Sequence, residues 1–172
     1  ESITTTFGTN SPRRTKTASR LRITSDTGLM EVADLEAIPI SVPQTTALRT
    51  GGSDTSTSGS GSFDHVLVRV TTADGVTGYG EAAPHPDWPQ SGTQSTVRSV
   101  INSKFAPLIE GRNVAHIARI TEELDRAVAS HPFARSAIDG ALYDAFGKHL
   151  DCPVFDLLGG PTSDDRSLPL HY

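Results

Sequence analysis

Alternating apolar and polar positions predict two paired β-strands near the middle of the chain. Residues 65–72 alternate strictly, which is typical of a strand with one buried face. Residues 73–75 (Ala-Asp-Gly) have the composition of a hairpin turn, and residues 76–82 return as the partner strand. One face of the first strand carries Val66, Val68 and Val70, and one face of the second carries Gly78 and Gly80. Glycines on a strand face predict the close approach of another backbone.

An earlier strand is predicted over residues 32–42, where Pro39 marks an edge strand. The segment that follows, residues 43–62, is rich in Ser, Thr and Gly, and its glycines disfavour both helix and strand. Such a composition is also typical of an interdomain linker. Because the preceding strand is too short to be a domain, we expect the segment to form a loop between two paired strands.

Apolar residues at helical spacing predict helices in the second half of the chain. After a proline-rich loop at residues 84–92, Ser91 or Thr93 is the expected N-cap of a first helix. Asn113 is the expected N-cap of a second helix, which ends before Pro132. The third helix has the most complete stripe, and segregated strands and helices indicate an α+β fold. The stripes are Val97, Val100, Ile101 and Phe105; Ile117, Ile120, Leu124, Ala127 and Val128; and Ala134, Ala137, Ile138, Ala141, Leu142, Ala145 and Phe146.

Two stretches carry a family resemblance. Residues 66–84 read VLVRVTTADGVTGYGEAAP, with a D-G turn and a G-x-G-E motif, and residues 136–160 read SAIDGALYDAFGKHLDCPVFDLLGG. Together they resemble the N-terminal capping domain of the mandelate racemase and muconate-lactonizing branch of the enolase superfamily. The resemblance implies a three-stranded antiparallel sheet followed by a helical bundle. Residues 167–172 (SLPLHY) resemble the first strand of the TIM-type barrel that follows the cap in this family, so the chain is expected to be truncated there.

These boundaries predict three parts. Residues 1–30 are expected to be a disordered or non-native leader, since they are rich in Ser and Thr and lack the apolar core of a signal peptide. Residues 31–160 are expected to be the enolase-like capping domain. Residues 161–172 are expected to be the start of the truncated barrel domain.

The resemblance also implies a chemistry. The family abstracts the proton next to a carboxylate, with Lys or His bases and a divalent metal, usually Mg2+, that stabilises the enediolate. Those groups lie on later barrel strands, so no catalytic residue and no metal ligand is expected in this chain. We therefore expect a Mg2+-dependent racemase, epimerase or cycloisomerase of the muconate type as the full-length protein. The 172-residue chain alone is predicted to be inactive.

In the family, the loop after the first strand and the loop after the G-x-G-E strand shape substrate specificity. Here these are residues 44–63 and 83–92, which makes Thr46, Arg49, His85, Asp87 and Trp88 the candidate specificity residues. Four of the five have a simpler interpretation as well. His85 and Asp87 lack a third ligand nearby and fit exposed loop positions, Arg49 fits a solvated arginine, and Trp88 fits packing against the helices of the cap itself.

Composition excludes several classes of function. Net charge is −5 at pH 7, and the basic residues of the leader leave an acidic body that does not favour nucleic acid. No apolar run is long enough to span a membrane. The single Cys152 fits a reducing, cytoplasmic location. A small carboxylate substrate and a homo-oligomer are expected from the resemblance.

Two other functions stay open at the level of the sequence. A mandelate-racemase-like acid-sugar dehydratase shares the same cap and differs in the barrel residues. A stand-alone α+β binding module without catalysis is the alternative from a different class. The apolar, unpaired SLPLHY strand does not favour the module, because soluble proteins avoid exposed apolar edges.

Overall fold

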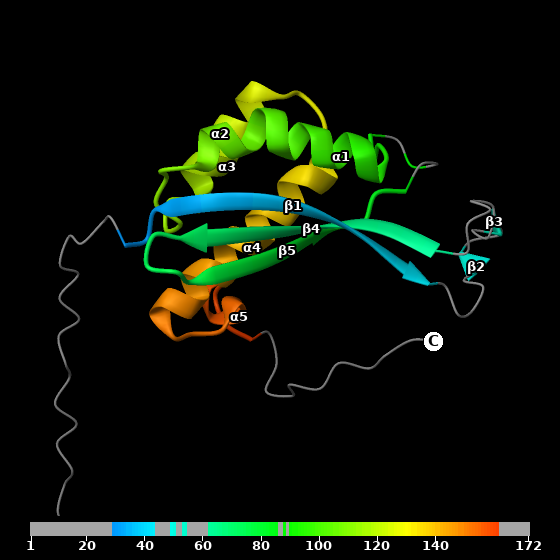
Figure 1. Cartoon of the computed structure of the whole chain (residues 1–172). Helices are drawn as coiled ribbons and strands as arrows, with labels where there is room; N and C mark the ends of the chain where they lie inside the picture. Colours follow the sequence, from blue (N-terminus) through cyan, green and yellow to red (C-terminus); the bar gives the residue numbers. More distant parts are fainter. Residues whose placement is uncertain are drawn as a thin grey trace, which may run out of the picture.

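The computed structural model describes residues 29–43, 49–50, 53–54, 62–85, 88 and 90–161. Four sequence predictions lie outside these residues: the leader up to residue 28, Thr46, Asp87 and the barrel strand at 167–172. The described part is a sheet with helices on one side of it (Figure 1).

Three strands form the antiparallel sheet that the sequence predicts. They are β1 (Val32–Pro43), β4 (Ser62–Thr72) and β5 (Thr77–Ala82), in the order β1-β4-β5. β1 pairs with β4 along its length, so the segment between them does connect two paired strands. Pro39 lies on β1, which is an edge strand of this sheet as predicted.

That connecting segment also contains two strands that the sequence analysis did not predict. Two very short strands, β2 (Arg49–Thr50) and β3 (Ser53–Asp54), pair with each other in antiparallel fashion. The pairing involves two residues on each side, so it needs little intrinsic strand propensity, and the composition of the segment therefore did not reveal it.

The first predicted helix consists of three consecutive pieces: α1 (Gln94–Val100), a π-helical turn (Ile101–Phe105) and α2 (Ala106–Ile109). Thr93 is the N-cap, since its side-chain oxygen accepts a hydrogen bond from the Thr96 N–H. Ala106 donates its N–H to the carbonyl of Ile101, five residues back. Pro107 has no N–H for an α-helical bond, which makes a change of bonding pattern at this point inexpensive.

The remaining helices are α3 (Ile117–Ala127), α4 (Pro132–Leu150) and α5 (Val154–Leu157). Asn113 does not cap α3 as predicted, because the N-cap residue is His116. The Asn113 side chain instead accepts a bond from the Ala115 N–H at 2.8 Å and fixes the turn before the helix.

The core lies between the inner face of the sheet and the helices, with α4 along β4 and β5 (Figure 1). Gly78 and Gly80 let α4 approach closely, as predicted. A Cβ atom on Gly80 would lie 1.9 Å from the Ala137 carbonyl oxygen, and one on Gly78 would lie 2.1 Å from that of Ala141. The predicted stripes supply most of the buried side chains: Val66, Val68, Val70, Val97, Ile101, Phe105, Ile117, Ile120, Leu124, Ala134, Ala137, Ile138, Ala141, Leu142 and Ala145.

Candidate functional site

The two loops that the sequence singles out leave the sheet at the same end. The last residue of β1, Pro43, pairs with the first residue of β4, Ser62. The last residue of β5, Ala82, pairs with Val66, only four residues further along β4. Figure 1 accordingly shows the β2–β3 hairpin and the turn before α1 at one end of the molecule. This end is the candidate site.

Hydrogen bonds link the described residues of the loop between β5 and α1 to one another. The His85 N–H donates to the Ser91 hydroxyl at 2.5 Å, the Trp88 N–H to the His85 carbonyl at 2.9 Å, and the Ser91 N–H to the Trp88 carbonyl at 3.2 Å. Ser91 is fully buried. A polar side chain in that position is stable only because it is bonded, so Ser91 fixes the shape of the turn.

Trp88 sits at the outer side of this turn. Its ring lies 5.4 Å from the His85 ring and 6.4 Å from the ring of Phe133, which belongs to the first turn of α4. Yet 58% of the residue is exposed. The two sequence interpretations of Trp88 are therefore compatible, since it contacts the cap's own helix and still offers a large apolar surface.

Of the five candidate specificity residues, the structure brings His85 and Trp88 together. Arg49 lies in β2, where its backbone pairs with Asp54. Thr46 and Asp87 lie outside the described residues. Sequence analysis assigned Ser91 no role beyond that of a possible N-cap, because no local pattern indicates that a loop serine is buried.

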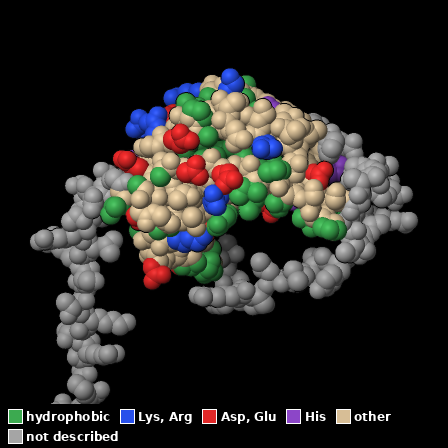
Figure 2. All heavy atoms as spheres, viewed as in Figure 1, with side chains coloured by type: hydrophobic (Ala, Val, Ile, Leu, Met, Phe, Trp, Pro, Cys, Tyr) green, Lys and Arg blue, Asp and Glu red, His purple; other side chains and the backbone are tan. Residues whose placement is uncertain are grey.

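The face of the sheet that points away from α4 carries a second group of polar side chains. His65 and Glu81 form a contact of 2.5 Å between β4 and β5, and Arg69 reaches Glu36 at 2.5 Å between β4 and β1. His65 thus lies on the outer surface of the sheet. Glu81 is half-exposed and occupied by this partner, which agrees with a structural role. Figure 2 shows apolar and charged side chains mixed over this side of the molecule.

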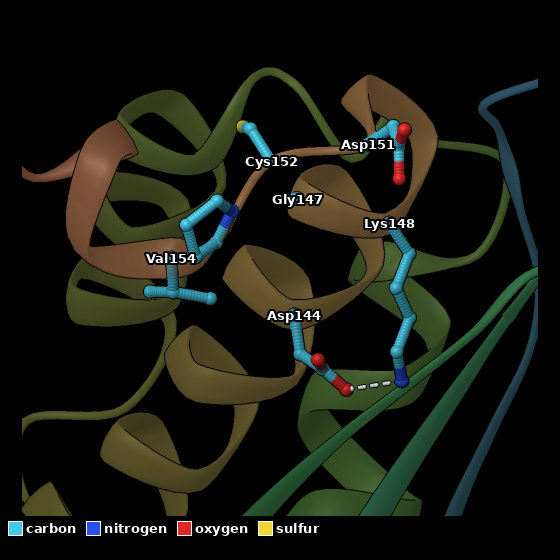
Figure 3. Close-up of a pocket in the computed structure, with 7 residues that line it drawn as sticks. Asp144, Gly147, Lys148, Asp151, Cys152 and Val154 are labelled. Carbon is cyan, nitrogen blue, oxygen red and sulfur yellow. Dashed lines mark hydrogen bonds and ion pairs between the residues drawn. The ribbon is translucent and has the colours of Figure 1, made fainter.

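A hollow of about 350 Å³ lies at the other end of α4. Its walls come from the end of α4 and the start of α5, and its one lysine is engaged by Asp144 (Figure 3). The Cys152 thiol at its rim is free. Asp144 and Lys148 already neutralise each other here, so the hollow has less to offer a charged substrate than the loop end. The lining residues are Asp144, Gly147, Lys148, Asp151, Cys152, Pro153 and Val154.

A magnesium site needs several oxygen ligands at one place. Among the described residues, no three His, Cys, Asp or Glu side chains gather closely enough to hold a metal ion. The part of the chain that the structure describes therefore offers no ligand set for the metal that the family resemblance implies. Within the same residues, no helix has the length and apolar character needed to cross a membrane.

Comparison with known families decides the membership of the chain. The family model described as "Mandelate racemase / muconate lactonizing enzyme, N-terminal domain" matches residues 38–159. The chain belongs to this family. The family is part of the enolase superfamily, which confirms the resemblance and the fold class predicted from the sequence.

Individual relatives agree. The chain is 42% identical over 96 residues to muconate cycloisomerase 1 of Rhodococcus opacus, covering 55% of this chain and 26% of the relative. It is 34% identical over 106 residues to the cis-3-hydroxy-L-proline dehydratase of Roseibium aggregatum, covering 62% and 29%. A muconate lactonizing enzyme from Pseudomonas fluorescens, solved in complex with muconolactone, superposes with a TM-score of 0.70 at 27% identity, covering 79% of this chain and 36% of that structure.

The chain thus spans about a quarter to a third of the length of these relatives. The relatives are enzymes, and the matched part is the cap. The match therefore assigns residues 38–159 to the N-terminal, capping domain of this family, whereas the activity needs a separate proposal.

Proposed function

We propose that this chain is the capping part of a muconate-cycloisomerase-like enzyme of the enolase superfamily, which acts at the carbon next to a substrate carboxylate. The observation that carries the proposal is the turn at residues 83–92. It presents a large exposed aromatic ring, Trp88, at the end of the sheet where both specificity loops leave it. The identity to a muconate cycloisomerase supports the choice of reaction class.

In this proposal the cap binds and encloses the substrate. Trp88 supplies apolar contact area, and Ser91 keeps the turn in one conformation so that little ordering is needed when substrate binds. Exclusion of water by such a cap strengthens the electrostatic interactions in the site beneath it. When bound, Mg2+ would stabilise the negative charge that develops on the carboxylate oxygens, and its ligands and the catalytic bases would come from residues outside this chain.

A dehydratase is the second candidate, and a specific observation favours it. The identity to cis-3-hydroxy-L-proline dehydratase, at 34% over a slightly longer stretch, is not far below the identity to the cycloisomerase. A cap shared by both reactions contributes to substrate choice and leaves the reaction type to the barrel. We further propose that the full-length enzyme takes a small carboxylate substrate and assembles as a homo-oligomer.

The experiment compares two proteins: the 172-residue chain, and the product of the same reading frame continued beyond Tyr172. Both are incubated with cis,cis-muconate and Mg2+, and the loss of the conjugated double bonds is followed by ultraviolet absorbance. We expect turnover only by the longer product. Turnover by the 172-residue chain would contradict the proposed division of labour, and a reading frame without a barrel would leave the binding-module alternative.

Trp88→Ala in the longer product tests the role of the turn. We expect KM to rise several-fold while kcat changes less, since apolar contact made equally in the ground and transition states acts on KM. Arg98→Ala, at an exposed position in the middle of α1, is the control. Equal kinetics for the two variants would remove Trp88 from the site.

A further inference from the structure

Gln94, the first residue of α1, connects three elements. Its side-chain amide donates one hydrogen bond to the Ile40 carbonyl at 2.9 Å and one to the His65 carbonyl at 2.7 Å. Ile40 and His65 are directly paired residues of β1 and β4. A glutamine amide has two hydrogens, and both are used here.

These bonds fall at the base of the turn that carries Trp88. The turn begins after Ala82, which pairs with Val66 of β4, and it ends at Gln94, which binds the neighbouring His65. Both ends of the turn are therefore attached to adjacent residues of a single strand. A surface loop whose ends are held close together behaves as one compact unit.

The same bonds lie close to one end of the β1–β4 pair, where β1 ends and β4 begins. Beyond the Ile40–His65 pair only three further pairs follow, the last of them between Pro43 and Ser62. Gln94 thus joins the base of the loop before α1 to β1 and β4. These are the two strands that the other candidate loop, residues 44–63, connects. Without it, α1 would still be anchored by Val97, which is fully buried one turn later, but its first residue would have no polar link to the sheet.

We propose that Gln94 is a positioning residue: its amide closes the base of the 83–93 turn on the β1–β4 pair and so sets where Trp88 stands relative to that end of the sheet. The bearing of this position on substrate choice rests on the function proposed above. The two hydrogen bonds of Gln94, which we call the Gln94 clamp, do not depend on that function, and they are tested without any activity measurement.

The test is amide hydrogen exchange on the 172-residue chain carrying Gln94→Met. Methionine keeps the length of the side chain and removes both donors. The amides of His85, Trp88 and Ser91, which are bonded within the turn, should exchange about 5- to 30-fold faster, since each lost bond contributes roughly a factor of five. Arg98→Met, the same replacement at an exposed position of α1, should leave them unchanged.

Trp88 supplies a spectroscopic signature that a general loss of stability would not mimic. It is the only tryptophan of the chain, so any local motion in its fluorescence anisotropy, beyond the tumbling of the whole protein, comes from this turn. We expect a lower anisotropy in Gln94→Met while the amides of β4 stay protected. Unchanged exchange of the three turn amides, with an unchanged anisotropy, would overturn the proposal.

A measurement on the unmodified chain decides the matter if Gln94→Met fails to fold. In the nitrogen-15 spectrum, the side-chain amide of Gln94 should exchange with water at least about tenfold more slowly than that of the exposed Gln90, because two bonds must open first. Equal exchange rates for the two side chains would overturn the clamp.

Discussion

The free edge of β5 is closed by two side chains of α4, and this contact gives a sharp stability prediction. In the described sheet β5 has one neighbour, β4, so its outward-pointing backbone groups have no strand to bind. Asp144 accepts the Tyr79 N–H at 2.8 Å, and Lys148 donates to the Thr77 carbonyl at 2.8 Å. The two side chains are also paired with each other at 2.7 Å, and the Lys148 ammonium lies 5.4 Å from the centre of the Tyr79 ring.

The magnitude follows from these contacts. A hydrogen bond to a charged group contributes about 1.5–3 kcal/mol when sheltered. Asp144 is 31% and Lys148 46% exposed, so solvent lowers the contribution toward that of an exposed pair, about 0.2–1 kcal/mol. Alanine also gains up to about 0.7 kcal/mol of helix propensity over aspartate. Asp144 makes two such bonds, one to the Tyr79 N–H and one to Lys148, and at about 0.5–1 kcal/mol each they total about 1–2 kcal/mol. After subtraction of the propensity gain, we expect Asp144→Ala to lower the free energy of unfolding by about 0.3–1.3 kcal/mol.

A double-mutant cycle cancels the difference in helix propensity and isolates the interaction between Asp144 and Lys148. The variants are Asp144→Ala, Lys148→Ala and their combination, and the assay is urea unfolding followed by circular dichroism. We expect a coupling energy of about 0.5–1 kcal/mol, because each side chain holds the other against the backbone of β5. The unpaired edge should also make Asp144→Ala associate more readily at high protein concentration.

Glu122 and Arg126 of α3 provide the matched control. They form the same i,i+4 pair at 2.5 Å but are 62% and 71% exposed, and the bond between them is not shared with a strand edge. Their coupling should be about 0.3–0.5 kcal/mol. If the Asp144–Lys148 cycle gives no more coupling than this surface pair, the reasoning that the pair closes the strand edge is refuted.

Two further predictions concern glycines and an acid. Gly80→Ala should destabilise the chain by about 2 kcal/mol or more, because the new Cβ has no room beside α4. Gly140→Ala should be neutral or stabilising by up to about 1 kcal/mol, since its Cβ would meet only the Gly80 Cα at 3.7 Å. Equal melting temperatures for the two variants would contradict this prediction. Burial alone would raise the pKa of Asp74, but the bond from Thr72, the charge of His149 and the Val76 N–H together lower it below its ordinary 3.8. Stability from this carboxylate should therefore be complete well above pH 3.8 and be lost as pH falls below that value, and thermal melts of Asp74→Asn should lack this part of the acid dependence.

The fold could be predicted where one local pattern decides the packing. The alternation at Val66, Val68 and Val70 placed β4 with one face in the core, and all three are fully buried. Gly78 and Gly80 predicted the close approach of another backbone, because two glycines on one strand face are a pattern visible in the sequence. The space that they leave is filled by α4.

Prediction from the sequence was wrong where the same residues are compatible with two different local structures. Asn113 is a good N-cap residue, but it is equally good at bonding a backbone N–H two residues on, and the structure uses it for that turn. The π-helical turn before Pro107 was also missed. A π-helical turn is an α-helical turn with one extra residue, so it changes the spacing of apolar residues very little. The periodicity of the sequence therefore does not distinguish a regular α-helix from one that contains such a turn.

The candidate site was located by resemblance, but its construction depends on contacts that no sequence pattern contains. Ser91 is fully buried although it lies in a loop, and Gln94 reaches residues 54 and 29 positions earlier in the chain. A polar residue at the start of a helix is typical of a solvated position, so both look ordinary in the sequence. Their role follows only once β1 and β4 are paired, because that pairing places two carbonyl groups within reach of a single amide. The base of the loop before α1 is thus held by the sheet beneath it, through partners that are distant in the sequence.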